Sequence, residues 1–457
     1  MAHIVFIMFS ENSAYRASLG AASLLREAGH DITYLGIEPY RQLVEKWGFR
    51  FQVFGYDEAL EASLQKENEA RVQKAQQKMK MLKPLRLIRL RMKLDNEAHQ
   101  RLEQKMKEDL AAWVCRESPD LIFLDQLFMW AYALPLLEAD VPLAGINCIL
   151  SDEAVAGIPP VTTDYIPADP PSRQDEKEAK KKWNRMYRKR LWDYWFSDSR
   201  KLRKQIAGTG TELRWQEFGY KLSIPEVVLF PPEFEFSSKG ETGQRRYVGG
   251  FTGKSHHHSE SNHFSEKYTG EKKLIYMSFG NIVTGERYAA ERERLCQAFL
   301  SLMKTRPELY GIMQVSDKDE AGRYQKQAGE NVEVVHWVDQ VAVLRSASLF
   351  ISHCGCSSIR EAMHFSVPVF GIPFDLDQPG NAARLQYHGA GVMRNPAGMT
   401  SEEFEDTVLH MLKDPAFRRK AKMMQKAFDR PENEEKLLEF VNRYVKKEKA
   451  DNEPISS

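Results

Sequence analysis

The turn around Trp337 has side chains that suit a nucleobase. Trp337 follows the apolar run Val332–Val335, so we expect its indole at the carboxyl end of a strand, where open α/β sheets bind ligands. A flat indole there can stack on a base, a contact worth about 1–3 kcal/mol. Val338 belongs to the same turn, and Gln340 is close enough along the chain to reach the base or the ribose. Taken alone, Trp337 is also typical of a core or rim aromatic residue.

The segment SLFISHCGCSSIREAM predicts a strand, a turn and the start of a helix. Ser357 and Ser358 open this helix, and the unpaired N–H groups of a first helical turn favour a diphosphate. Gly355 has no Cβ, so the backbone can approach a ligand closely. His353 can donate a hydrogen bond to a phosphate oxygen and offset charge on a leaving group. The alternative is an ordinary helix capped by Ser357, with a structural histidine before it.

Three further groups could complete a site for a sugar nucleotide. Glu361 lies four residues after Ser357, and its carboxylate can accept hydrogen bonds from two ribose hydroxyls. Asp377 and Gln378 follow the predicted strand VPVFGIP and offer acceptors and donors suited to the edge of a hexose. Turn amides also follow the first strand of this half, at Ser278, Gly280 and Asn281.

The elements that must position these residues alternate between strands and helices in two halves. His3–Phe9 and Ile32–Gly36 are continuous apolar runs, typical of buried parallel strands, and a helix-like segment separates them. Gly29 stands where that helix would end in a left-handed residue. The alternation restarts at Leu274, and 457 residues exceed the size of one core. The sequence therefore predicts an α/β protein with two doubly wound parallel-sheet domains.

Composition indicates where these domains end. Residues 237–273 are rich in Gly, Ser, Thr, His and Glu, which marks a linker region between domains over 1–236 and 274–430. We expect residues 431–457 to form a helix, which could cross back to the first domain, and a polar tail. Four linker histidines lack the cysteines or ordered carboxylates of a metal site, so we expect no bound metal. They are His256, His257, His258 and His263.

Two long charged segments interrupt the first half. Leu60–Val114 has recurrent Leu among Lys, Glu and Gln, which predicts a long amphipathic helix or a helical hairpin. Asp175–Lys204 interleaves basic residues with Trp183, Tyr187, Trp192, Trp195 and Phe196. Either this aromatic stripe lies in the core with the basic groups in water, or the helix contacts an anionic membrane surface or borders an apolar acceptor site.

Charge and cysteine content exclude several classes of protein. Lys+Arg 65 against Asp+Glu 64 gives a net charge of +1, which argues against a nucleic-acid binder with a large basic surface. Five cysteines are few and odd in number, as in a protein with reduced thiols. The N-terminus does not resemble a signal peptide, and no window approaches the ~20 apolar residues of a membrane span. We therefore expect a cytoplasmic enzyme, at most peripheral to the inner face of the membrane.

The spacing of the motifs resembles the donor-binding signature of the family 1 UDP-dependent glycosyltransferases. The motifs are W-V-x-Q, H-C-G-x-x-S-x-x-E, G-I-P and D-Q-P-x-N-A, and they are closest in character to bacterial macrolide-type members. The resemblance implies the GT-B fold, with an N-terminal acceptor-binding domain and a C-terminal nucleotide-sugar-binding domain that face each other across a cleft. Two positions depart from the family pattern: Asp339, where W-x-P-Q has Pro, and Cys356, where many members have Trp or Ala.

The resemblance also assigns roles to residues. It implies that a UDP or TDP sugar is held by one set of side chains and that Asp377 and Gln378 contact the sugar itself. The nucleotide-binding set is Trp337, Gln340, His353, Gly355, Ser358 and Glu361. The family is metal-independent, so the donor is a co-substrate and no cofactor is expected.

The histidine that serves this family as general base is absent. The family's G-H-x-x-P turn would place it near Ala14, and no residue of FSENSAYR is histidine. The carboxylate that normally orients it is matched by Asp125, at the end of a predicted strand. Three explanations remain open: Glu11 or Asp125 acts as the base, an easily ionised acceptor needs only positioning, or the chain binds nucleotide sugar without catalysis.

The expected reaction is an inverting transfer of a hexose to a hydroxyl of a small apolar or aromatic acceptor. The alternatives are a non-catalytic nucleotide-sugar-binding homologue or activator, and a membrane-surface transferase with a lipid acceptor. Neither the sugar nor the oligomeric state follows from the sequence.

Overall fold

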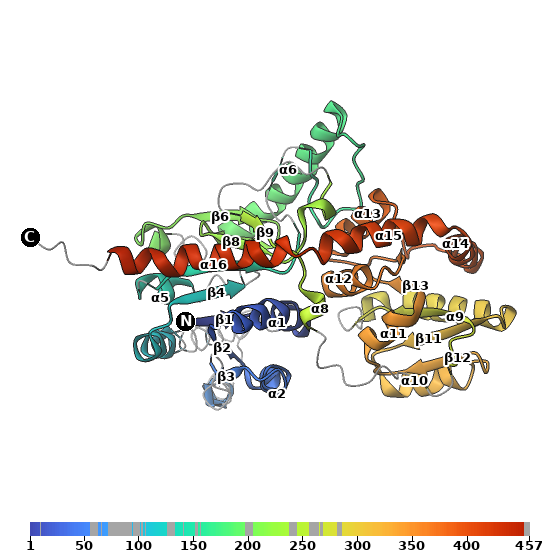
Figure 1. Ribbon diagram of the computed structural model, residues 1–457, viewed down its shortest axis with the longest axis horizontal. Helices are drawn as coiled ribbons and strands as arrows, with labels where there is room; N and C mark the ends of the chain where they lie inside the picture. Colours follow the sequence, from blue (N-terminus) through green and yellow to red (C-terminus); the bar gives the residue numbers. More distant parts are fainter. Residues whose placement is uncertain are drawn as a thin grey trace, which may run out of the picture.

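The described part of the chain forms two parallel sheets and one short antiparallel hairpin, with helices packed around both sheets (Figure 1). The computed structural model describes residues 1–9, 11–54, 63–64, 66–71, 94, 101, 104–105, 107–125, 133–139, 141–150, 154–155, 157–196, 204–236, 245–255, 265, 268–280 and 286–451. The predicted pair of parallel-sheet domains is confirmed.

The first sheet has seven strands in the order β3-β2-β1-β4-β5-β8-β9, all parallel. They are β1 (His3–Ile7), β2 (Asp31–Gly36), β3 (Arg50–Val53), β4 (Leu121–Asp125), β5 (Leu143–Asn147), β8 (Glu226–Val228) and β9 (Arg245–Tyr247). β4 is buried along its whole length, as its continuous apolar run predicts. Ile7 pairs with Leu124, so the turn after β1 and the end of β4 meet at the same edge of the sheet.

The second sheet has six parallel strands in the order β12-β11-β10-β13-β14-β15. They are β10 (Lys273–Ser278), β11 (Leu309–Gln314), β12 (Val332–Val335), β13 (Ala347–Ser352), β14 (Val369–Gly371) and β15 (Gly391–Met393). Ser278 pairs with both Gln314 and Ser352. The carboxyl ends of three strands therefore meet at one edge, and the motif residues that follow β10 and β13 are brought together there.

Helices connect these strands. In the first half they are α1 (Asn12–Glu27), η1 (Glu38–Tyr40), α2 (Arg41–Glu45), α5 (Ala133–Glu138), α6 (Arg173–Phe196) and η3 (Pro232–Phe234), with the hairpin β6 (Leu213–Gln216) and β7 (Gly219–Leu222). Beyond it they are α8 (Thr252–Ser255), η5 (Glu286–Tyr288), α9 (Ala289–Thr305), α10 (Lys318–Gln325), α11 (Gln340–Ser346), α12 (Cys356–His364), α13 (Gln378–Tyr387), α14 (Ser401–Lys413), α15 (Pro415–Phe428) and α16 (Glu432–Asp451). Gly29 has a φ of 88°, as predicted for the residue that ends α1.

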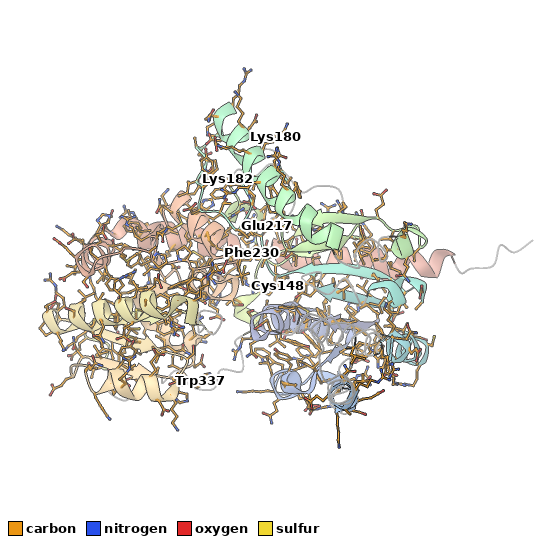
Figure 2. All side chains as sticks on the ribbon, turned by 180° about the vertical axis from the view of Figure 1, so that it is seen from behind. Cys148, Lys180, Lys182, Glu217, Phe230 and Trp337 are labelled. Atoms are coloured by element: carbon orange, nitrogen blue, oxygen red, sulfur yellow. The ribbon has the colours of Figure 1, made fainter. Side chains whose placement is uncertain are left out.

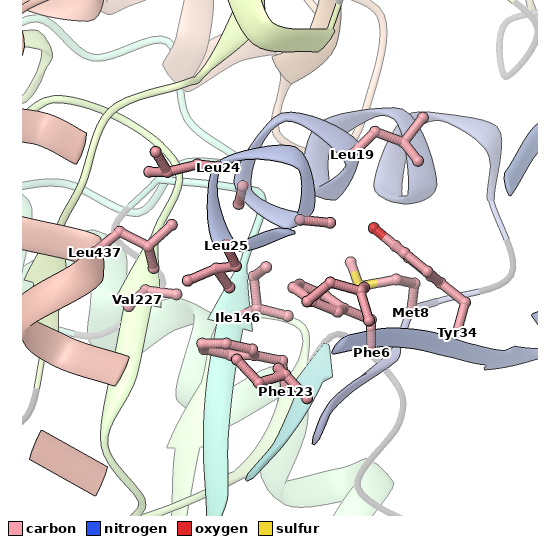
Figure 3. Close-up of a cluster of buried hydrophobic side chains, with 14 of the residues drawn as sticks. Phe6, Met8, Leu19, Leu24, Leu25, Tyr34, Phe123, Ile146, Val227 and Leu437 are labelled. Atoms are coloured by element: carbon pink, nitrogen blue, oxygen red, sulfur yellow. The ribbon is translucent and has the colours of Figure 1, made fainter. Parts of the chain in front are cut away.

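The last helix packs on the first half of the molecule. α15 and α16 run in succession across both halves (Figure 1). Leu437 and Phe440 of α16 belong to the same buried cluster as Phe6 and Phe123 of the first sheet, and Leu437 lies near Leu25 in Figure 3. The C-terminal helix therefore contributes to the core of the first half.

The segment after β8 packs into the second half. β8 ends at Val228, although its apolar run continues to Phe230. Phe230 and Phe234 join a core cluster with residues of the second sheet such as Tyr276. Glu235 accepts a hydrogen bond from Arg384 Nε at 2.7 Å, and both side chains are buried. Because of this packing, the strand ends two residues earlier than its apolar run indicates.

The range 237–273, predicted as a linker, contains regular structure at Arg245–Ser255. β9 pairs with β8, and α8 packs against α1. A three-residue strand is too short to show in the composition of the segment that surrounds it. The four linker histidines lie outside the described residues, as does most of Leu60–Val114.

α6 projects away from both sheets (Figure 1). Trp183 is buried, and its Nε1 donates to Ile158 O at 2.8 Å, whereas Lys180, Lys181 and Arg185 are exposed. At Trp183 the helix thus follows the interpretation in which the aromatic residue faces the protein and the basic residues face water. No described helix combines the length and apolarity needed to cross a membrane.

Candidate active site

The turn between β13 and α12 presents free backbone donors. Cys354 has a φ of 66°, and its N–H donates to Ser352 Oγ at 3.1 Å, which turns the chain sharply into the helix. The N-cap residue of α12 is Gly355, which has no side chain to accept from the first-turn amides. These N–H groups carry the positive end of the helix dipole and can bind an anionic group.

His353 fills the space that two glycines leave open. A Cβ on Gly280 would come 2.7 Å from His353 Cε1, and a Cβ on Gly355 would come 2.6 Å from its Nε2. The ring is buried, and burial lowers its pKa from 6.5 to about 4, partly opposed by a hydrogen bond with the Ser278 backbone. At neutral pH His353 is therefore an uncharged imidazole that can donate one hydrogen bond.

Gln340, Ser358 and Glu361 form one hydrogen-bonded corner. Gln340 Nε2 donates to Glu361 Oε2 at 2.6 Å and lies 3.5 Å from Ser358 Oγ. Its Oε1 accepts from the Tyr276 hydroxyl at 3.2 Å, which orients the amide. Glu361 is buried, and burial raises the pKa of its carboxyl. The corner is thus preformed, with a carboxylate suited to two vicinal hydroxyls.

Trp337 lies in the turn that precedes Gln340, and its side chain is exposed. It is 65% exposed, which is unusual for so large an apolar ring, and Figure 2 shows it on the second half. Val338 is partly buried and packs against the core of that half. Asp339, where the family has Pro, is the N-cap of α11 and accepts from Val341 N at 3.1 Å and Ala342 N at 3.4 Å.

Asp377 and Gln378 have different surroundings. Asp377 Oδ2 accepts from Asn381 Nδ2 at 2.6 Å and from the Cys356 thiol at 2.9 Å, and burial raises the pKa of this carboxyl. Cys356, the other departure from the family pattern, therefore ties the start of α12 to the Asp377 carboxylate. Gln378 is buried, and its carbonyl oxygen accepts from Phe374 N at 2.9 Å, so only its NH₂ group could meet a sugar.

Ser278 and Gly280 support the site from β10. The Ser278 hydroxyl donates to Gln314 Oε1 at 3.3 Å, and Gly280 N donates to Ser278 Oγ at 3.4 Å. Gly280 has a φ of 65°, a conformation that favours glycine. Asn281 lies outside the described residues.

The two carboxylates predicted for the acceptor side lie at the ends of β1 and β4. Asp125 is buried, and its Oδ2 accepts from Phe9 N at 3.3 Å. Glu11 is the N-cap residue of α1, is exposed and makes no side-chain capping bond. Ala14, at the position of the family's histidine, is buried, and the Cys148 thiol lies 3.9 Å from its carbonyl oxygen. The two predicted carboxylates thus flank one turn of the first half.

The helix starts of the two halves touch. The Ser357 hydroxyl, in the first turn of α12, donates to Ser13 O in the first turn of α1 at 3.2 Å. Arg360 Nη2 in turn donates to Ser357 Oγ at 3.2 Å. Sequence reasoning missed Ser13, Cys148 and Arg360; only Arg360 left a signal, a charged residue between the serine and glutamate of the motif. Among the described residues no three potential ligands are grouped for a metal ion.

Comparisons with known proteins agree with this geometry. Oleandomycin glycosyltransferase of Streptomyces antibioticus is 30% identical over 162 residues, which is 35% of this chain and 36% of that protein. The chain spans about a third of the length of the curated relatives it matches. The glycotransferase of kitacinnamycin has a TM-score of 0.67 at 15% identity, over 97% of this chain and 98% of that one. The glycosyltransferase VinC in complex with dTDP has a TM-score of 0.62 at 15% identity, over 96% and 100%.

These structural likenesses confirm the GT-B fold. The family model described as "UDP-glucoronosyl and UDP-glucosyl transferase" matches residues 4–440, nearly the whole chain. The chain belongs to the UDP-glucoronosyl and UDP-glucosyl transferase family.

Proposed function

We propose that the protein is an inverting glycosyltransferase, which moves a hexose from a UDP or TDP sugar to a hydroxyl of a small apolar or aromatic acceptor. The observation that carries this proposal is the corner of Gln340, Ser358 and Glu361 beside the uncapped start of α12. Such an arrangement offers ribose acceptors and diphosphate donors at adjacent positions. Relatives named as oleandomycin glycosyltransferase and as a dTDP-bound glycosyltransferase support the donor and the acceptor class.

In this mechanism the donor is held in three parts. The base stacks on Trp337, the ribose hydroxyls donate to Glu361, and the diphosphate accepts from the first-turn amides of α12. His353 is uncharged at neutral pH, so its single N–H donates to a phosphate oxygen in exchange for its hydrogen bond with the Ser278 backbone. These donors are fixed before the reaction, so they stabilise charge on the leaving group without reorganisation. The mechanism requires no metal ion, and Asp377 accepts from a sugar hydroxyl.

Glu11 is the group that we assign to receive the acceptor proton. Its carboxylate is exposed at the start of α1, next to the contact between α1 and α12. Asp125, buried and bonded to Phe9 N, holds the turn on which Glu11 stands. Phe9, whose carbonyl oxygen accepts from Glu11 N, and Tyr40, whose pKa the Glu11 charge helps to raise, are both partly exposed, which suits an aromatic acceptor.

Release of UDP, measured with and without a library of phenolic and macrolide acceptors, tests this function. We expect acceptor-dependent release that Glu11→Gln lowers by about 100-fold or more, within the range of general-base catalysis. Glu308→Gln, on an exposed turn away from the site, should leave turnover unchanged. Intact turnover in both Glu11→Gln and Asp125→Asn would show that no carboxylate base is used. No turnover with any donor, together with thermal stabilisation by UDP, would favour a binding protein.

A lipid acceptor at a membrane surface is the second candidate. The exposed basic residues Lys180, Lys181 and Arg185 on the projecting α6 favour it. Co-sedimentation with vesicles of anionic and of zwitterionic lipid tests this candidate, because basic helices bind the anionic ones in a salt-dependent way. Absence of binding to both kinds of vesicle at low salt would remove it.

A further inference from the structure

Arg360 is a buried cation without a counter-ion among the described residues. Its side chain is 3% exposed, yet no described carboxylate lies within salt-bridge distance of it. Nη2 donates to Ser357 Oγ at 3.2 Å, and Nη1 is buried with no hydrogen-bond partner. A charge removed from water in this way is costly unless an anion compensates it.

The other buried lysine and arginine residues of the described chain are all paired. Lys221 and Arg245 both contact Glu226, at 2.9 and 2.8 Å, and Arg384 is paired with Glu235. Each of these three buried cations in the described part of the chain therefore has an acidic partner. Arg360 has no such partner among the described residues, and it lies where a negatively charged ligand is expected.

The guanidinium of Arg360 lies at the start of α12. Side chains on a helix lean toward its N-terminus, and the bond to Ser357 places the guanidinium beside the first-turn amides. It lines a pocket between the two halves with Arg16, Ser357, Thr252 and Glu361.

Two neighbours shape this position. A Cβ on Gly250 would come 3.1 Å from Arg360 Cδ, so the glycine leaves room for the stem. The Phe230 ring, 5.5 Å away, covers one face of the guanidinium and leaves its edges for hydrogen bonds. Phe230 and Cys148 mark this junction of the halves in Figure 2.

The charge of Arg360 affects the pKa of two carboxyls in the site. It lowers the pKa of Glu361 and of Asp377, although burial outweighs it at both carboxyls and raises their pKa overall. Arg16, exposed on α1, also acts on Glu361 from the opposite half. The positive charge on the pocket is therefore contributed by both halves.

We propose that Arg360, assisted by Arg16, forms an oxyanion subsite that receives the diphosphate of the nucleotide sugar. This inference rests on the proposed function. As the bond between the anomeric carbon and the β-phosphate oxygen breaks, its electron pair passes to that oxygen. The acceptor oxygen bonds to the anomeric carbon, and its proton passes to Glu11. A guanidinium offers two parallel N–H donors to a phosphate, and so stabilises the negative charge that develops on the leaving group.

Equilibrium binding of UDP, uridine and inorganic pyrophosphate tests the subsite by calorimetry. In Arg360→Gln we expect UDP affinity to fall about 10- to 100-fold, the equivalent of one lost charged hydrogen bond, with uridine affinity unchanged. Arg360→Lys should recover part of the loss. Arg345→Gln, on α11 and exposed, is the matched control and should bind all three ligands as the wild type does.

Equal losses for UDP and uridine would assign Arg360 a structural role and overturn the proposal, as would an unchanged UDP affinity. An unchanged UDP affinity with a raised KM only for carboxylated acceptors would assign the pocket to the acceptor instead. If Arg360→Gln fails to fold, Arg16→Gln serves in its place, because Arg16 is exposed. We then expect a smaller loss of affinity, for UDP and pyrophosphate but not for uridine. Pyrophosphate binding that depends on Arg360 would support the subsite even if no nucleotide bound, an outcome that would refute only the proposed function.

Discussion

At the scale of single residues, the site depends on small groups that make room for larger ones. Gly280 and Gly355 leave the space that the His353 ring occupies, and Gly250 does the same for Arg360. The motif spacing assigned Gln340, Ser358 and Glu361 to one site, and the structure brings their side chains together. The spacing could not predict that the Gln378 carbonyl would bond to Phe374 N or that Cys356 would bond to Asp377, because these contacts depend on how two separate turns approach each other.

Gly355→Ala tests the space around His353 directly. The backbone of Gly355 has a φ of −64°, so alanine adds no backbone strain there, but its Cβ would collide with the imidazole. We expect kcat/KM to fall about 10- to 100-fold as the ring is displaced. Gly322→Ala in α10, where nothing lies within 4 Å, should leave activity intact and stabilise the protein by about 0.5–1 kcal/mol. Full activity in Gly355→Ala would contradict this explanation of the glycine.

The buried ring of His353 should also make stability depend on pH. The folded ring binds its proton near pH 4 and the unfolded ring near 6.5, so the unfolded chain holds more protons between these values. The free energy of unfolding should therefore fall as the pH drops from 6.5 to 4, by about 3 kcal/mol for this group, and be level outside that window. Urea denaturation of the wild type and His353→Asn at a series of pH values measures it. Parallel pH profiles for the two proteins would rule the effect out.

At the scale of elements, short helices and turns hold the site. Continuous apolar runs predicted the buried strands well, because burial on both faces leaves a clear signal. β9 and the early end of β8 were not predictable from the sequence. A strand of three residues leaves no clear signal in the composition, and the packing of Phe230 into another core leaves no signal in its apolar run. The role of Asp339 as an N-cap also became clear only from the direction of α11.

Asp339→Ala should separate capping from donor binding. Loss of the cap costs about 1 kcal/mol of stability, and it loosens the first turn of α11, which carries Gln340. We therefore expect a raised KM for the donor as well as a lower midpoint of denaturation. Asp414→Ala removes a similar cap from α15, far from the site, and should lower stability alone. If both variants kept the wild-type KM, Gln340 would not depend on its helix cap.

At the scale of the whole molecule, the two halves are joined by buried contacts. Gly380 N donates to Val161 O at 2.7 Å, and no Cβ could be accommodated on Gly380. The Glu235 and Arg384 pair and the aromatic residues after β8 extend this junction. Such contacts join residues far apart in the chain, so the sequence predicted two domains but not how they pack.

Arg384→Leu should be among the most destabilising changes in the molecule. It leaves the buried Glu235 carboxylate without its partner, a loss of about 3–5 kcal/mol. Arg323→Leu breaks an exposed pair with Glu293 and should cost no more than about 1 kcal/mol. Chemical denaturation of both variants provides the comparison. Similar small losses in the two would mean that the buried pair contributes little to joining the halves.

The proposed function requires that the second half holds a nucleoside diphosphate, with Glu361 on its ribose. The affinity of UDP for the wild type and for Glu361→Ala, measured by calorimetry, tests it most directly. We predict that UDP binds the wild type and that the substitution weakens binding about tenfold or more, since it removes a charged acceptor from two hydroxyls. Failure of UDP to bind the wild type would show that the second half is not a nucleotide site, and equal affinity in the two proteins would show that Glu361 does not hold the ribose.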